Sequence, residues 1–153
     1  MTIDSFLIQL CEHCGMAVDS ISVEVTDTDD GKQIQLTVPE DDSGLFIGFH
    51  GETLESLQRI VRLIFQETPD ERLLVNVNNY REQRQEKLED LVKEAAERVV
   101  SSGNPYTFQS FLPAYERYIV HASLAELPDA EKLESISDGM GRDRRLTIRL
   151  KTT

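Results

Sequence analysis

Residues 47–54 read Ile47-Gly48-Phe49-His50-Gly51-Glu52-Thr53-Leu54, and their two glycines are separated by two residues. Apolar residues with helical spacing follow this stretch, which predicts a tight turn between two helical segments. Because glycine lacks a Cβ atom, a sugar-phosphate backbone can approach the turn closely, and free N–H groups at the start of the next helix favour a phosphate. The candidate nucleic-acid-binding residues of this turn are Gly48, Phe49, His50 and Gly51.

The flanking segments alternate in a recognisable order. Residues 3–13 have the apolar spacing of a short helix, and residues 21–25 and 34–38 alternate apolar and polar side chains on either side of a turn at 29–31. Residues 73–77 alternate in the same way after the helical segments. The first half of the chain is therefore expected to fold in the order α-β-β-α-α-β.

The second half begins with a long amphipathic segment at 80–102, which Asn79 can cap and Gly103 can end. A short strand at 106–108, a helix with Pro113 in its first turn and a hairpin turning at 138–141 follow. We expect one domain at 1–79 and a second at 80–153, with the long helix connecting them.

Charge is unevenly distributed along the chain. The net charge is −12, and residues 1–79 carry four basic against 15 acidic side chains. Residues 138–151 form the one basic patch of the sequence. A chain this acidic does not hold duplex DNA by overall charge, so any nucleic-acid site must be local.

Arg117 and His121 lie four residues apart in the segment after Pro113. This spacing places both side chains on one helix face, where they can contact one phosphate. We expect them to form one anion-binding surface with Arg145 and Arg149 of the last strand. Arg144 is a further candidate. The alternative is structural: Arg117 would pair with a carboxylate, from Glu116, Asp138 or Asp143.

The two motifs together resemble a known family. A glycine turn within the order α-β-β-α-α-β is typical of a type II KH domain, and the Arg-x-x-x-His spacing defines the R-three-H domain, a single-stranded nucleic-acid-binding module. This combination resembles the Jag family of bacterial proteins, also called KhpB or SpoIIIJ-associated proteins. The stretches that carry the resemblance are 44–57, 80–82, 115–121 and 144–148.

This resemblance implies an α+β protein with a type II KH domain followed by a small R-three-H domain. It further implies single-stranded RNA binding, with single-stranded DNA as a possible substitute, and a role in post-transcriptional regulation in the bacterial cytoplasm. Family members can pair with a small single-KH protein, so a heterodimer of that kind or a homodimer is expected.

The glycine turn departs from the family pattern, because nucleic-acid-binding KH domains usually have a basic residue where this chain has Phe49 and His50. Phe49 can stack on a base, and a protonated His50 can pair with a phosphate. We expect the KH half to contribute less than Arg117 and His121. The alternative is that the acidic KH half has lost RNA binding and serves as a protein-interaction or dimerisation module.

No pattern of an enzyme or a metalloprotein is present in the sequence. Cys11 and Cys14 have metal-like spacing, but with His13 they leave a tetrahedral zinc site one ligand short. No nucleophile elbow, phosphate-binding loop of a nucleotidase or metal triad occurs. We expect no catalysis, no cofactor and no metal. No apolar run approaches the ~20 residues of a membrane span, which is consistent with a cytoplasmic protein.

Overall fold

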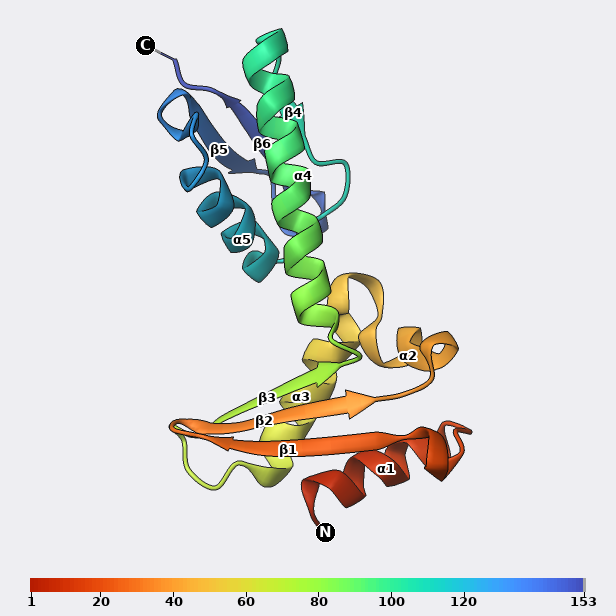
Figure 1. The fold of residues 1–153 in the computed structure, drawn as a ribbon. Helices are drawn as coiled ribbons and strands as arrows, with labels where there is room; N and C mark the ends of the chain where they lie inside the picture. The colour runs from red at the N-terminus through yellow and green to blue at the C-terminus, as the bar shows by residue number, and fades with distance from the viewer. Residues whose placement is uncertain (153) are drawn as a thin grey trace. The chain divides into compact units, whose positions relative to one another are not determined.

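The computed structural model describes residues 1–152, which form two compact units, 1–81 and 82–152. Each unit has helices packed on a small three-stranded sheet, which confirms the expected α+β class (Figure 1). No helix among the described residues is both long and apolar enough to cross a membrane.

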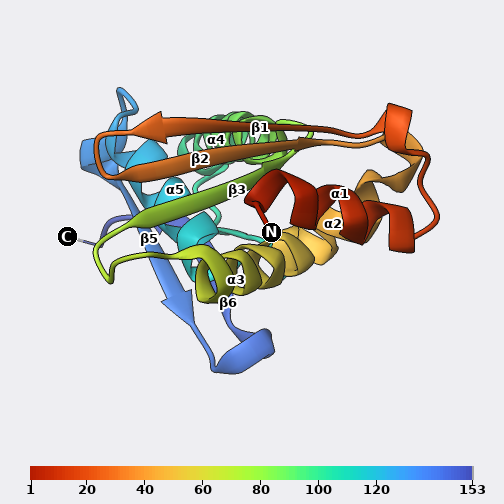
Figure 2. The same ribbon diagram turned by 90° about the horizontal axis from the view of Figure 1, so that it is seen from below.

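The first unit has the predicted order α-β-β-α-α-β. Its helices and strands are α1 (Ile3–His13), β1 (Ser22–Thr28), β2 (Gly31–Thr37), α2 (Ser43–Ile47), α3 (Glu52–Phe65) and β3 (Arg72–Val77). In the sheet order β1-β2-β3, β1 pairs with β2 antiparallel and β2 with β3 parallel. Helices α1 and α3 pack on the same side of this sheet (Figure 2).

Alternating apolar residues explain how this unit packs. Ile34 and Leu36 of β2 and Leu73, Val75 and Val77 of β3 are buried in one core. Buried residues of the helices, which are spaced three or four apart, complete this core: Leu7, Cys11, Leu54, Leu57 and Val61. The two segments that carry the glycine turn, α2 and α3, are thereby fixed against the sheet.

The chain leaves β3 through Asn78 and Asn79, which both have left-handed backbone angles (φ 49° and 59°). The expected cap of the long helix is therefore not formed as predicted. Asn76 Oδ1 instead accepts the main-chain N–H of Arg81 at 3.3 Å in the first turn of that helix. Asn79 adopts the left-handed conformation, which asparagine tolerates better than most residues, because the chain must turn sharply here.

The second unit contains most of the long helix α4 (Tyr80–Ser102), followed by β4 (Tyr106–Thr107), α5 (Ala114–Ala125), β5 (Leu133–Asp138) and β6 (Arg145–Leu150). Its sheet has the order β4-β6-β5 and is antiparallel throughout. Pro113 precedes α5 instead of lying within its first turn, a difference of one residue.

One face of this sheet is covered by the two helices. Leu146 and Ile148 of β6 are buried in one core with Val92 and Val99 of α4 and Val120 of α5. Leu150 lies on the same face by the alternation of the strand, at its exposed end. Strand β5 is an edge strand next to α5, and this position decides which side chains meet the motif helix.

Candidate nucleic-acid interface

The glycine turn joins α2 to α3 with backbone angles that favour glycine. Gly48 has φ 71° and ψ −175°, and a Cβ atom there would lie 2.9 Å from Cβ of Thr53. Gly51 has φ 78° and ψ 15° and is buried. Both positions therefore need glycine, because other L-residues are strained at these angles and, at Gly48, would also clash.

Phe49 and His50 occupy the gap between the glycines. Phe49 is 62% exposed, and its ring lies edge-on to the ring of His50 with centroids 4.1 Å apart. His50 has a left-handed backbone (φ 51°). An exposed aromatic ring at a glycine turn can stack on an unpaired base, but the pair brings no permanent positive charge to a phosphate.

The start of α3 is weakly suited to an anion. Its N-cap, Gly51, has no side chain that could cap the helix, so no side chain at the N-cap bonds the first N–H groups. However, Glu52 and Glu55 place carboxylates in the first turn. Glu55 is paired with Arg81, with 2.8 Å between Oε1 and Nη1. The helix N-terminus attracts a phosphate while Glu52 opposes it, so the turn supplies shape more than charge.

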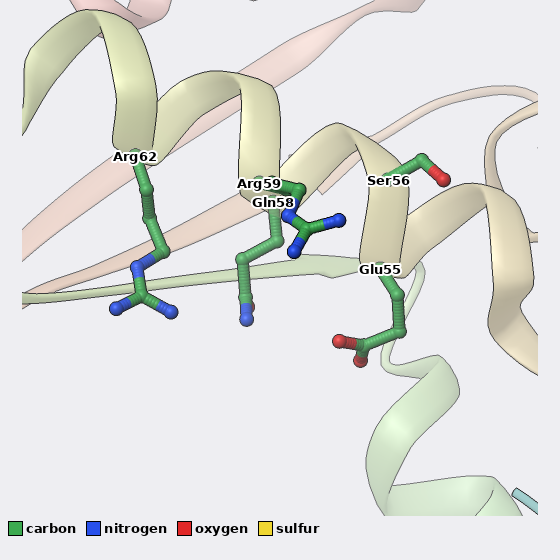
Figure 3. A pocket seen from close by; sticks show the side chains of 5 residues that line it. All are labelled: Glu55, Ser56, Gln58, Arg59 and Arg62. Carbon is green, nitrogen blue, oxygen red and sulfur yellow. The ribbon is translucent and has the colours of Figure 1, made fainter.

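Two arginines that are not among the predicted site residues lie on α3. Arg59 and Arg62 line a pocket of about 360 Å³ together with Glu55, Ser56 and Gln58 (Figure 3). Among the described residues neither guanidinium has an ion-pair partner. The spacing of these arginines in the sequence could have identified them as a pair. They are two of the four basic residues in 1–79, and they lie three apart, on neighbouring turns of one helix.

The edge of β3 beside this pocket is occupied by side chains. Gln58 Oε1 accepts the main-chain N–H of Val75 at 3.0 Å, and Arg81 Nε donates to the carbonyl of Val75 at 3.0 Å. Arg81 also donates to Gln58 Oε1 at 3.0 Å. These bonds satisfy the main chain at the centre of the edge strand, so Arg59 and Arg62 are the positively charged groups left for a ligand in this pocket.

In the second unit, α5 presents Arg117 and His121 one turn apart. Arg117 Nη1 donates to the carbonyl of Leu112 at 2.7 Å, which directs the guanidinium along the start of the helix. His121 Nδ1 is hydrogen-bonded to Ser135 Oγ of β5. Partial burial, and then the nearby charge of Arg117, lower the pKa of His121 below its usual value of 6.5.

The residue before Arg117 fixes this helix in place. Glu116 is fully buried, and Arg84 of α4 donates to its carboxylate from Nε at 2.8 Å and from Nη2 at 3.1 Å. Of the three carboxylates that the structural alternative offered to Arg117, Glu116 is therefore bound to another arginine. This two-point contact sets the position of α5 on α4 within the unit.

Arg144 lies on the same side of the sheet as the motif helix. Its Nε donates to Ser137 Oγ at 2.6 Å, and Ser137 is two residues from the Ser135 that contacts His121. Residues two apart in a strand share a face. Arg144 and His121 therefore each bond a serine on the same face of β5.

The expectation that Arg117, His121, Arg145 and Arg149 form one surface is wrong. Strand β6 turns Leu146 and Ile148 toward the helices, so Arg145 and Arg149 lie on the opposite face of the sheet. Arg149 Nε there pairs with Glu134 Oε1 at 2.7 Å, and Arg145 Nη1 donates to the carbonyls of Arg142 and Arg144. Arg117 and His121 lie close together on α5, and Arg144 is bonded to β5, the strand that His121 contacts.

The cysteines show no feature of a metal or redox site. Cys11 is buried and Cys14 is exposed, and both are free thiols. Burial, followed by the neighbouring Cys14, raises the pKa of Cys11 to about 11. No group of three or more potential ligands from His, Cys, Asp and Glu that could hold a metal occurs within residues 1–152.

Comparison with known families finds one match in each half of the chain. Residues 4–77 match the model of the KhpA/KhpB KH domain, and residues 86–150 match that of the R-three-H domain. The fold and the two motifs therefore define a protein with a KH domain followed by an R-three-H domain. This domain pair and the related proteins described next show that the chain belongs to the KhpB family.

Related proteins found by comparison are named KhpB. The RNA-binding protein KhpB of Clostridium symbiosum is 36% identical over 148 residues, which cover 95% of this chain and 64% of the relative. The KhpB proteins of Bacillus subtilis and Lactiplantibacillus plantarum are 27% and 26% identical, and the matches cover 82% and 93% of this chain. The chain spans 44% to 64% of the length of these relatives.

Proposed function

We propose that this chain binds single-stranded RNA, with Arg117, His121 and Arg144 as the main phosphate contacts. The observation that carries the proposal is the arrangement of α5 beside β5, where a guanidinium and an imidazole lie one turn apart on α5, and His121 and Arg144 each bond a serine on one face of β5, Ser135 and Ser137. Three donors on one surface suit a splayed sugar-phosphate backbone better than a duplex groove. The names of the relatives and both matched domains support RNA as the ligand.

The glycine turn has a supporting role in this proposal. Phe49 offers a stacking surface and Gly48 and Gly51 permit close approach, while Arg59 and Arg62 supply the positive charge that the turn lacks. We assign these contacts to a KH domain at 1–79 and the stronger ones to an R-three-H domain at 80–153. Arg145 and Arg149 are secondary contacts on the other sheet face. The corresponding cellular role is post-transcriptional regulation in the cytoplasm.

A binding titration tests the proposal. Fluorescence anisotropy with a 20-nucleotide RNA, single-stranded or as a duplex, is measured at several salt concentrations. We expect tighter binding of the single strand and a salt slope that corresponds to about two to four phosphate contacts. Arg117→Ala should weaken binding by about 1–3 kcal/mol and lower the slope by about one.

Arg98→Ala is the matched control, because it removes the same charge from the same unit at an exposed position on α4. It should leave the affinity nearly unchanged. Equal affinity for duplex and single strand, or an equal loss in both variants, would contradict the proposed site. A melting curve of Arg117→Ala separates loss of binding from loss of folding.

One observation favours a second function, protein association through the first unit. Three apolar side chains on α3 are exposed, Ile60, Leu63 and Ile64, and Leu63 is 81% exposed. A row of this kind on a surface helix fits an interface with a second copy or with a small single-KH protein. Leu63→Glu, with Leu45→Glu as an exposed control on α2, should lower the mass measured by light scattering at high concentration if α3 is that interface.

A further inference from the structure

A pocket of about 350 Å³ lies next to His121 in the second unit. Its walls come from the end of α5, the segment before β5, strand β5 itself and Lys151 after β6. This volume is at the lower end of the range for pockets that hold small organic molecules, about 300–1,000 Å³. The pocket is therefore large enough for one nucleotide.

The inner part of the pocket is apolar. Leu124 of α5 and Leu133 of β5 are buried side chains that reach it, and Ala125 and Ala130 line it with small side chains. Small residues beside buried leucines leave room for a flat ring to lie against carbon. Burial of a nucleobase in such surroundings is favourable because every base has an apolar face.

Hydrogen-bonding groups line the rest of the pocket. His121, Ser135 and Lys151 offer donors, and Glu131 offers carboxylate oxygens. Glu134 also lines the pocket, but its carboxylate pairs with Arg149 at 2.7 Å on the other face of the sheet. Within residues 1–152, Glu131 has no ion-pair partner, so its carboxylate is the acceptor that remains for a ligand.

We propose that this pocket holds one unpaired base that carries an exocyclic amino group, as cytosine, adenine and guanine do. Glu131 would accept the amino hydrogens, as carboxylates do with cytosine N4, and the carbonyls of uracil offer it no donor at that position. The adjoining phosphate would lie at His121 and Lys151. The inference rests on the proposed RNA binding and adds base selection to it.

Filling the pocket is the first test. Ala125 is exposed at the end of α5, so Ala125→Trp can block the pocket without entering the core. Gln83→Trp is the control, because Gln83 is exposed on α4 and does not line the pocket. We expect Ala125→Trp to bind a 12-nucleotide cytidine RNA about tenfold more weakly than the natural protein, and Gln83→Trp to bind it equally well. Equal affinity of a folded Ala125→Trp would overturn the pocket as a base site.

Base selection is the second test and needs no bulky substitution. The natural protein should bind oligocytidine about fivefold more tightly than oligouridine of the same length, and Glu131→Ala should bring this ratio close to one. Glu131→Ala also removes a negative charge, which affects both RNAs alike and leaves the ratio as the readout. A ratio of one in the natural protein would overturn this inference alone, whereas absence of binding to either RNA would overturn the proposed function.

Discussion

The buried carboxylate of Glu116 in α5 accepts two hydrogen bonds from the guanidinium of Arg84 in α4, at 2.8 and 3.1 Å. The side chain of Glu116 is 0% exposed and that of Arg84 is 17% exposed, so water screens this pair little. Because Arg117 follows Glu116 directly, the position of the motif helix depends on this contact. The pair therefore links the packing of α4 to the geometry of the proposed phosphate site.

Removal of one partner of this pair should strongly destabilise the second unit. Arg84→Ala leaves the Glu116 carboxylate buried without its two-point partner, and we expect a loss of about 3 kcal/mol in the free energy of unfolding. Arg98→Ala, which breaks an exposed ion pair with Glu94 on the same helix, should cost less than about 1 kcal/mol. Urea unfolding followed by circular dichroism measures both. Similar small losses would mean that the buried pair does not fix α5.

The two glycines before and within the turn should respond oppositely to alanine. Gly48→Ala forces a Cβ atom into Thr53 at a positive φ and should cost about 2 kcal/mol or more. Gly44 lies in helix α2 with no atom within 4 Å of a Cβ at that position, so Gly44→Ala should stabilise by about 0.5–1 kcal/mol. Thermal unfolding of both variants checks this contrast. A stable Gly48→Ala variant would show that the turn relaxes without glycine.

The thiols should differ in reactivity. Cys11 is buried with a pKa raised to about 11, so almost no thiolate forms at pH 8, whereas Cys14 is exposed. Iodoacetamide at pH 8 should modify Cys14 first, and Cys11 should react only in denaturant. Mass spectrometry of peptides after timed quenching gives both rates. Rapid modification of Cys11 in the folded protein would show that α1 opens readily.

Local patterns in the sequence were sufficient to predict the order of elements. Apolar and polar residues alternate at 34–38 and 73–77, and two glycines mark the turn. These signals lie in neighbouring residues, and they correctly predict the order of helices and strands in the KH half. The pairing of Arg84 with Glu116 could not be predicted in this way. The two residues are 32 positions apart, and nothing in either helix alone indicates that they meet.

The error at the last strand has a physical cause that is visible in its own pattern. If Leu146 and Ile148 face the motif helix, the residues between and beside them must face away, so Arg145 and Arg149 cannot meet His121. Arg144 could not be placed from sequence because it follows a short 3₁₀ turn at Gly141–Asp143, whose path is set by packing. Arg59 and Arg62 were predictable in principle, since their helical spacing is explicit.

Acidification should strengthen RNA binding through His121. The pKa of His121 is lowered in the free protein by partial burial and by Arg117, so the ring is mostly neutral at pH 7. A phosphate beside the ring favours the protonated form, and binding must then take up a proton. We expect the affinity for single-stranded RNA to rise as the pH falls from about 7 to 5.5. Anisotropy titrations at constant ionic strength measure this trend.

The lowered pKa of His121 also predicts that the fold becomes less stable as the pH falls, whereas RNA binding becomes stronger. Below pH 6.5 the unfolded chain binds a proton at His121 more readily than the folded chain does. His121 therefore stabilises the fold above pH 6.5. This contribution is lost as the pH falls through the lowered pKa of His121. His121→Gln should remove both the rise in RNA affinity at low pH and the part of the loss of stability at low pH that His121 causes. His50→Gln is the matched control in the glycine turn. If the acid increase persisted in His121→Gln and disappeared in His50→Gln, the titrating phosphate contact would belong to the KH domain instead of the motif helix.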